Sequence, residues 1–187
     1  MGDHGQSFTR TDLVVAEAVE LGAAIREWLI QGQVIVEESN DDCVFRGVGH
    51  PPASNWGSTS HSYEDADNFL RLRTNGVQIV GGVPGVVIYP NGSKLDSSCP
   101  RCNNDVGEPF WAILQDWSEV VGDDERPRLQ CPSCGRDLAA TDCVLDDSWS
   151  LSFVEVTFMN WPPFSESFKA EVLERLGGNS RFVFGKK

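Results

Sequence analysis

The chain lacks the features that mark a membrane or secreted protein. It holds no apolar run near the roughly 20 residues that a membrane-spanning helix needs. Its N-terminal stretch, residues 1–10, is polar and has no apolar segment of the kind that defines a signal peptide. We therefore expect a cytoplasmic protein without membrane contact, whose six cysteines are reduced and available for metal binding.

Positive charge is also scarce. The 15 lysines and arginines stand against 28 aspartates and glutamates, which gives a formal net charge of −13. An acidic surface repels phosphate backbones, so the charge disfavours nucleic-acid binding and favours a basic protein partner. Acidic side chains gather at 37–42, 123–125 and 146–147. Such runs are typical of solvated turns, and they also suit a face that docks a basic protein.

The sequence signatures of common enzymes are missing. There is no Gly-x-x-x-x-Gly-Lys phosphate loop, no Gly-x-Ser-x-Gly nucleophile elbow and no His-Glu-x-x-His motif. An enzyme that uses the His50–Asp67 segment, with His50, His61 and the acidic residues after it, is one hypothesis. However, those acidic residues also suit the first turn of a helix, where negative charge is favourable. We therefore lean towards a non-enzymatic protein.

What the chain does contain is enough apolar material for a folded core, with 40% hydrophobic residues in a length of 187. Residue patterns predict three main helices, over 11–31, 62–75 and 165–176. Apolar runs predict strands over 34–36, 43–45, 77–80, 86–89, 149–159 and 182–184. The order strand, helix, strand after 149 suggests two neighbouring strands, which are parallel if the helix crosses over. We expect an α+β (or α/β) domain with a mixed sheet and flanking helices.

Four cysteines form the clearest sequence motif of the chain. They are arranged as Cys99-Pro100-Arg101-Cys102 and, after twenty-eight residues, Cys131-Pro132-Ser133-Cys134. Two Cys-x-x-Cys turns supply a full tetrahedral set of thiolates for one ion. The residue after each pair often needs a positive φ, which Gly135 and Asn103 tolerate better than other residues. The spacing therefore predicts a metal site at Cys99, Cys102, Cys131 and Cys134.

This stretch resembles zinc ribbons and their rubredoxin-like relatives over about residues 97–138. The resemblance implies a closed, structural zinc site in a module inserted into a domain formed by 1–96 and 139–187. The gap between the pairs exceeds that of a compact ribbon, so we expect extra structure at 109–121. Phe110, Leu114, Trp117 and Val121 fall there on one helical face, which would pack on the ribbon or the main domain.

Other readings of the cysteines stay open. An iron centre that transfers electrons has the same ligands, although Asn103-Asn104-Asp105 stands where rubredoxins usually have glycine and an aromatic residue. Thioredoxin-like redox chemistry needs a Cys-x-x-Cys that opens a helix after a strand, and neither pair is so placed. Cys43 lies in an apolar run and should be buried. Cys143 could be a spare ligand, but its apolar neighbours also favour burial.

The candidate interaction surface lies elsewhere in the chain. The aromatic residues of the turn Asn160-Trp161-Pro162-Pro163-Phe164 are framed by prolines, which suits a rigid contact patch, although Trp161 also suits the edge of a core. The Gly-, Pro- and Ser-rich loop over 47–61 carries His50, Trp56 and His61, and loops of this length are often functional.

With its cysteine-pair insert and Trp-Pro-Pro turn, the chain also resembles uncharacterised bacterial α/β proteins of similar size, which implies no assigned activity. Our hypothesis is a non-enzymatic protein with a structural zinc site that binds a basic protein partner, as an immunity or regulatory protein does. The alternatives are an enzyme that uses the His50–Asp67 segment and an iron electron carrier.

Overall fold

The structure is a computed structural model that describes residues 3–45, 47–60, 66–89, 96–117 and 126–186. The predictions for His61, for the helix start at Ser62, for Val121 and for the acidic run 123–125 lie outside these residues. The elements in chain order are β1 (His4–Arg10), α1 (Val15–Gln31), η1 (Trp56–Thr59), α2 (Ala66–Arg71), β2 (Val77–Ile88), β3 (Ser97–Ser98), α3 (Gly107–Trp117), β4 (Arg128–Gln130), β5 (Asp137–Ala139), η2 (Ala140–Asp142), β6 (Val144–Leu145), β7 (Trp149–Met159), α4 (Glu166–Leu176) and β8 (Ser180–Lys186).

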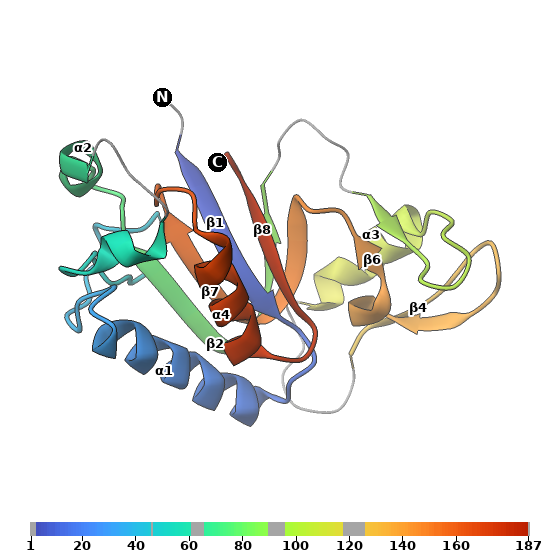
Figure 1. Ribbon diagram of the computed structural model, residues 1–187. Coiled ribbons are helices and arrows are strands. Elements are labelled where there is room, and N and C mark those ends of the chain that lie inside the picture. The colour runs from blue at the N-terminus through green and yellow to red at the C-terminus, as the bar shows by residue number, and fades with distance from the viewer. Residues whose placement is uncertain (1–2, 46, 61–65, 90–95, 118–125, 187) are drawn as a thin grey trace.

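The centre of the molecule is a four-stranded sheet in the order β2-β7-β1-β8 (Figure 1). Every neighbouring pair in this sheet is antiparallel. The α+β prediction is thereby confirmed. The expectation that β7 and β8 are neighbours is wrong, because β1 lies between them and pairs with both.

The strand β1 was not foreseen from the sequence, because five of its seven residues have polar side chains. Those of Ser7 and Thr9 are buried and paired across the sheet. The Ser7 hydroxyl contacts the Tyr89 hydroxyl at 2.7 Å and also contacts Thr157, and the Thr9 hydroxyl lies 2.8 Å from that of Ser150. A buried polar group costs little free energy once it is hydrogen-bonded, so a central strand can be rich in serine and threonine.

Two expected strand pairs take a different form. Residues 34–45 contain only isolated bridges, from Ile35 to Pro52 and from Asn40 to Gly49, in place of the predicted strands over 34–36 and 43–45. The predicted strands 77–80 and 86–89 are one strand, β2, whose pairing with β7 shifts between Gly81 and Gly85. The glycines therefore make an irregularity within one strand, which is a common use of glycine in sheets.

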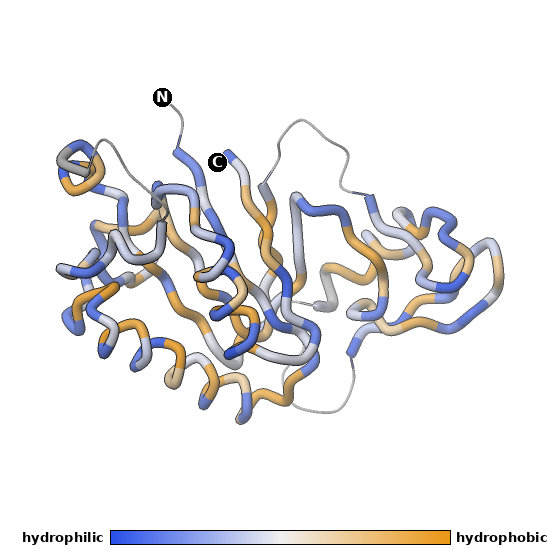
Figure 2. The backbone as a smooth tube through the Cα atoms, viewed as in Figure 1, coloured by the Kyte–Doolittle hydropathy of each residue, from blue (hydrophilic) through white to orange (hydrophobic). Residues whose placement is uncertain are grey.

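Helices α1 and α4 lie together over one face of this sheet (Figure 1). Their side chains meet where the Trp28 ring stacks on Phe168 at 5.9 Å and the Arg175 guanidinium lies 4.3 Å above Trp28. Hydrophobic and hydrophilic residues alternate around α1 (Figure 2), as expected for a helix with one buried face. The expected start of α1 at Thr11 moves to Val15, and residues 11–14 connect β1 to the helix.

The cysteines lie in a second part of the molecule, built from two small two-stranded sheets, β3 with β6 and β4 with β5, and from α3 (Figure 1). Because β6 pairs with β3, this part extends to Leu145, beyond the expected boundary at 138. The division into two domains stays a prediction.

Aromatic side chains join α3 to the large sheet. The rings of Phe110 and Trp111 pack on Trp149 at 5.2 and 5.3 Å, and Trp117 packs on Phe153 at 5.0 Å. The Trp117 indole N–H donates to the Gly85 carbonyl at 2.9 Å. The 109–121 face was expected to pack on the ribbon or on the main domain, and the Phe110 and Trp117 rings contact β7 of the large sheet.

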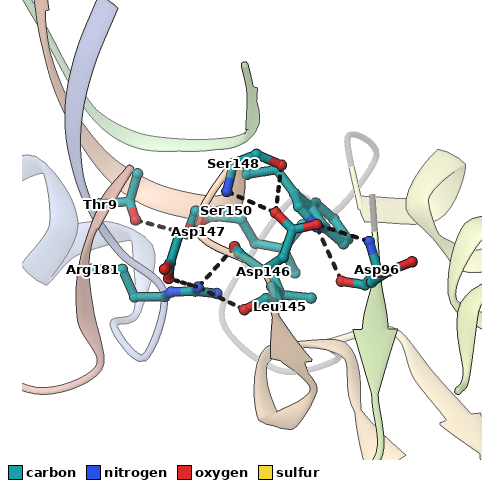
Figure 3. Close-up of polar contacts among 10 residues, drawn as sticks. Thr9, Asp96, Leu145, Asp146, Asp147, Ser148, Ser150 and Arg181 are labelled. Carbon is teal, nitrogen blue, oxygen red and sulfur yellow. Dashed lines mark hydrogen bonds and ion pairs between the residues drawn. The ribbon is translucent and has the colours of Figure 1, made fainter. Parts of the chain in front are cut away.

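A polar junction also links the two parts (Figure 3). The Arg181 guanidinium of β8 donates to the carbonyls of Leu145 at 2.8 Å and Asp146 at 3.0 Å, just before β7 begins. The Asp146 carboxylate accepts from the backbone N–H of Asp96 at 2.9 Å and of Ser148 at 2.7 Å. Desolvation opposes the charge on Asp146, but these hydrogen bonds outweigh it and lower the pKa of the carboxyl. The junction fixes both chain ends of the cysteine-bearing part.

The contact of α1 with β2 yields a stability test. A Cβ added at Gly81 would lie 2.4 Å from the Ala18 carbonyl oxygen of α1, so Gly81→Ala has to push the helix away. We expect a loss of about 1–3 kcal/mol in the free energy of unfolding, measured with urea. Gly57→Ala is the control, because no atom lies within 4 Å of its added Cβ. Equal stability of the two variants would contradict the close packing.

Candidate metal centre

The two Cys-x-x-Cys turns have the same backbone geometry. The Asn103 N–H donates to the Cys99 carbonyl at 2.9 Å, and the Gly135 N–H donates to the Cys131 carbonyl at 2.9 Å. In return, the N–H of Cys99 and of Cys131 each donate to the carbonyl five residues further along the chain, at 3.0 and 2.8 Å. Asn103 has φ 59° and Gly135 has φ 68°, so the predicted positive φ after each pair is confirmed.

The four sulfur atoms converge on one point. The Sγ atoms of Cys99 and Cys134 are 3.8 Å apart, those of Cys102 and Cys131 are 3.7 Å apart, and all four lie within 4.8 Å of one another. A tetrahedral ion with metal–sulfur bonds of about 2.3 Å holds its ligands about 3.8 Å apart. The four predicted ligands are therefore placed to bind one metal ion. Among the described residues they form the one such group of His, Cys, Asp and Glu side chains.

Electrostatics favour thiolates at the first cysteine of each pair. The backbone N–H of Cys102 bonds to the Cys99 sulfur and, with weaker help from neighbouring groups, lowers the pKa of Cys99 to about 6. The backbone N–H of Cys134 likewise lowers the pKa of Cys131. At Cys134 the Arg136 amide works in the same direction, but desolvation and the three neighbouring sulfurs prevail and raise its pKa to about 11. Metal binding would displace that last proton.

The other two cysteines are not part of the sulfur group. Cys43 is buried beside Val44 and Met159, and desolvation raises the pKa of its thiol. Cys143 is buried too, and desolvation, with weaker effects from the charges of Asp142 and two of the ligand cysteines, raises its pKa to about 12. Its thiol points to the Ala139 carbonyl at 3.8 Å. Both cysteines occupy the buried environment that their apolar neighbours predicted.

The candidate interaction residues of the 47–61 loop are mostly part of the scaffold. His50 and Trp56 are each only 8% exposed. The His50 backbone pairs with Val77 at the start of β2, and its ring Nδ1 lies 3.1 Å from the Val36 carbonyl. The Trp56 ring packs on Phe69 at 4.4 Å. These residues hold the loop against the core and offer little surface to a partner, while His61 lies outside the described residues.

The turn after β7 is likewise anchored. Asn160 has φ 52°, and its side-chain amide donates to Asp3 at 2.7 Å and to the Thr74 carbonyl at 2.8 Å. Trp161 is fully buried and Phe164 nearly so, at 4% exposure. The expected surface is therefore corrected to a buried turn, in which Trp161 covers the end of the core.

The residues that fix this turn escaped the sequence analysis. The Gln6 side-chain amide donates to the carbonyls of Trp161 at 2.9 Å and Pro162 at 3.0 Å, and His4 Nε2 lies 3.0 Å from the Trp161 carbonyl. Both belong to β1, whose polar sequence gave no strand pattern. The available signal was the two-residue spacing of His4, Gln6 and Phe8, which places all three on one face of a strand.

Comparison with protein-family models, curated proteins and solved structures finds no match to this chain. Within the described residues, no helix combines the length and the apolar character that crossing a bilayer requires. Function is therefore argued from the geometry of the molecule itself.

Thiol labelling tests the cysteine assignments. With metal bound, iodoacetamide should leave Cys43 and Cys143 unmodified, since both are buried and their raised pKa values keep them as thiols. Removal of metal with a chelator should expose Cys99, Cys102, Cys131 and Cys134 to labelling. Peptide mapping by mass spectrometry identifies the modified residues. Labelling that is unchanged by the chelator would contradict a four-cysteine metal site.

Proposed function

We propose that the protein is a non-enzymatic binding protein whose four cysteines hold a structural zinc ion. The supporting observation is the convergence of four sulfurs, with two separations of 3.7 and 3.8 Å and all four atoms within 4.8 Å of one another. Four thiolates complete the tetrahedral coordination of one zinc ion and leave no position for a substrate or water. Catalytic zinc sites instead use three protein ligands and keep one position open. Iron fits the same ligand set, and the metal content decides between the two.

The ion would act as a clamp between segments that are distant in the chain. Cys99 and Cys102 follow β3, whereas Cys131 and Cys134 lie in the turn between β4 and β5. Contacts of α3 with β3 and β4 place the helix beside both pairs. A metal ion bound to all four sulfurs would fix these segments together, and through them the aromatic contacts of α3 with β7.

Replacement of one ligand tests the structural role of the metal. Cys131→Ser should lose the bound ion and several kcal/mol of stability, because metal binding contributes directly to folding. For a chain of this size the melting temperature should fall by about 10 °C or more. Differential scanning fluorimetry and elemental analysis measure the two quantities.

The matched control for this variant is Cys43→Ala, which alters a buried cysteine far from the sulfur group in the chain. It should keep one metal ion per chain and lose only about 1 kcal/mol. If Cys131→Ser melts at the same temperature as the parent chain, the metal has no structural role.

We further propose that the partner is a basic protein, as expected for an immunity or regulatory protein. The net charge of −13 supports this, and so does the exposure of Glu37, Glu38, Asp41 and Asp42 in the loop after α1. Asp42 forms an ion pair with Arg73, whereas the structure gives Glu37, Glu38 and Asp41 no ion pair with a described residue. Clustered exposed acidic groups attract a basic surface and speed its association.

Charge reversal tests the partner proposal. The triple variant Glu37→Lys, Glu38→Lys and Asp41→Lys should reduce capture of a basic protein from an extract of the native host by about tenfold or more at low salt. The control carries the same change in charge at exposed sites on α1 and α4, Glu20→Lys, Glu27→Lys and Glu174→Lys. If both variants lose capture of the basic protein equally, the net charge of the chain and not the 37–42 cluster is responsible. If the parent chain captures no basic protein, the partner proposal is wrong. Neither result bears on the metal site.

A further inference from the structure

A groove of about 640 Å³ opens at the end of the large sheet where β1 begins and β8 ends. His4 at the start of β1 and Lys186 at the end of β8 are paired at this end of the sheet (Figure 1). The groove is lined by residues of β1, of the turn after β7, of α4 and of β8. Its volume falls in the range of sites that bind small organic ligands, about 300–1,000 Å³.

The lining of the groove is largely aromatic. Phe182 and Phe184 of β8, whose rings are stacked at 5.8 Å, supply its accessible aromatic surface, whereas Trp161 and Phe164 of the turn border the groove but are buried. Phe184 is 56% exposed, although it lies on the same sheet as the fully buried Phe8 and Phe158. A large apolar side chain left this exposed inside a groove provides contact surface for an apolar ligand.

The turn that forms one side of the groove is rigidly held. The Gln6 amide and the His4 ring both contact the Trp161 carbonyl, and the Trp161 indole N–H donates to the Thr59 hydroxyl at 2.9 Å. Phe164 packs on Phe158 at 4.8 Å. Because these residues are fixed in advance, a ligand would lose little free energy to ordering them.

The charged side chains among the described lining residues of the groove are lysines. Lys169 and Lys186 line it, and no aspartate or glutamate is among its described lining residues. Lys169 forms an ion pair with Glu166 at 2.8 Å, and its ammonium lies 5.1 Å above the Phe182 ring. In a chain of net charge −13, this local pair of lysines favours an anionic group beside the aromatic surface.

We propose that this groove binds a small amphipathic carboxylate, a compound with an apolar acyl or aryl body and one carboxylate. The body lies against Phe182 and Phe184, and the carboxylate lies at Lys186 and Lys169. Size favours such a ligand over a protein partner, because 11 residues line the groove, whereas a standard protein interface engages about 20–30 residues on each side.

Decanoate is the probe, and isothermal titration calorimetry is the measurement. The parent chain should bind decanoate saturably at one site. Phe184→Ser should weaken binding about tenfold or more, since it removes the exposed aromatic ring against which the apolar body lies. Lys186→Glu should weaken decanoate binding several-fold and leave binding of the uncharged analogue decanol unchanged, because the carboxylate alone meets the lysine.

Matched controls use side chains outside the groove. Leu70→Ser alters an apolar side chain that is 52% exposed on α2, and Arg26→Ala removes an exposed charge on α1. Both should bind decanoate as the parent chain does. Circular dichroism confirms that Phe184→Ser and Lys186→Glu are folded, which is expected since both residues are exposed.

Three outcomes would overturn the proposal. One is the absence of saturable decanoate binding to the parent chain, and another is unchanged affinity in Phe184→Ser. The third is self-association of the parent chain, measured by analytical ultracentrifugation, that disappears in Phe184→Ser, which would assign the groove to a second copy of the chain. None of these outcomes depends on the metal site or on a basic partner.

Discussion

Convergence of four sulfurs on one point is the constraint on which the cysteine-bearing part depends. Two turns with matching backbone hydrogen bonds bring Cys99 and Cys102 from one segment to meet Cys131 and Cys134 from another. The strands on either side of them are only two or three residues long. Strands this short contribute little independent stability, so a metal ion would supply what a small core cannot.

The large sheet buries polar side chains at its centre, and each of them needs a hydrogen-bond partner. Ser7 and Thr9 in β1 find partners on neighbouring strands, so the strand that unites β7 and β8 needs few apolar residues. The same strand provides Gln6, which anchors the Trp161 turn. Aromatic contacts of α3 with Trp149 and Phe153 then couple the sheet to the cysteine-bearing part. A metal ion bound at the four sulfurs would therefore act on β7 through α3, as the proposed clamp requires.

Local patterns predicted the parts of the fold that local chemistry decides. The ligand cysteines, the positive φ of Gly135 and the helix that Ser165 caps all follow from residue type and spacing. The sequence could not predict β1, because its hydropathy is that of a polar tail and only its partners make it a strand. It also could not place Phe184 in a groove, since its exposure depends on where the turn after β7 and the start of α4 lie over the sheet. Both the pairing of β1 and the exposure of Phe184 depend on contacts with segments that are distant in the sequence.

The most direct test of the structural zinc site is native mass spectrometry of the purified chain, with its absorption spectrum recorded on the same sample. The account predicts one zinc ion per chain, no visible absorption, and loss of the folded charge-state distribution when the ion is removed. A folded chain without metal would contradict the clamp, and a coloured chain with one iron ion would replace it with an electron-transfer centre.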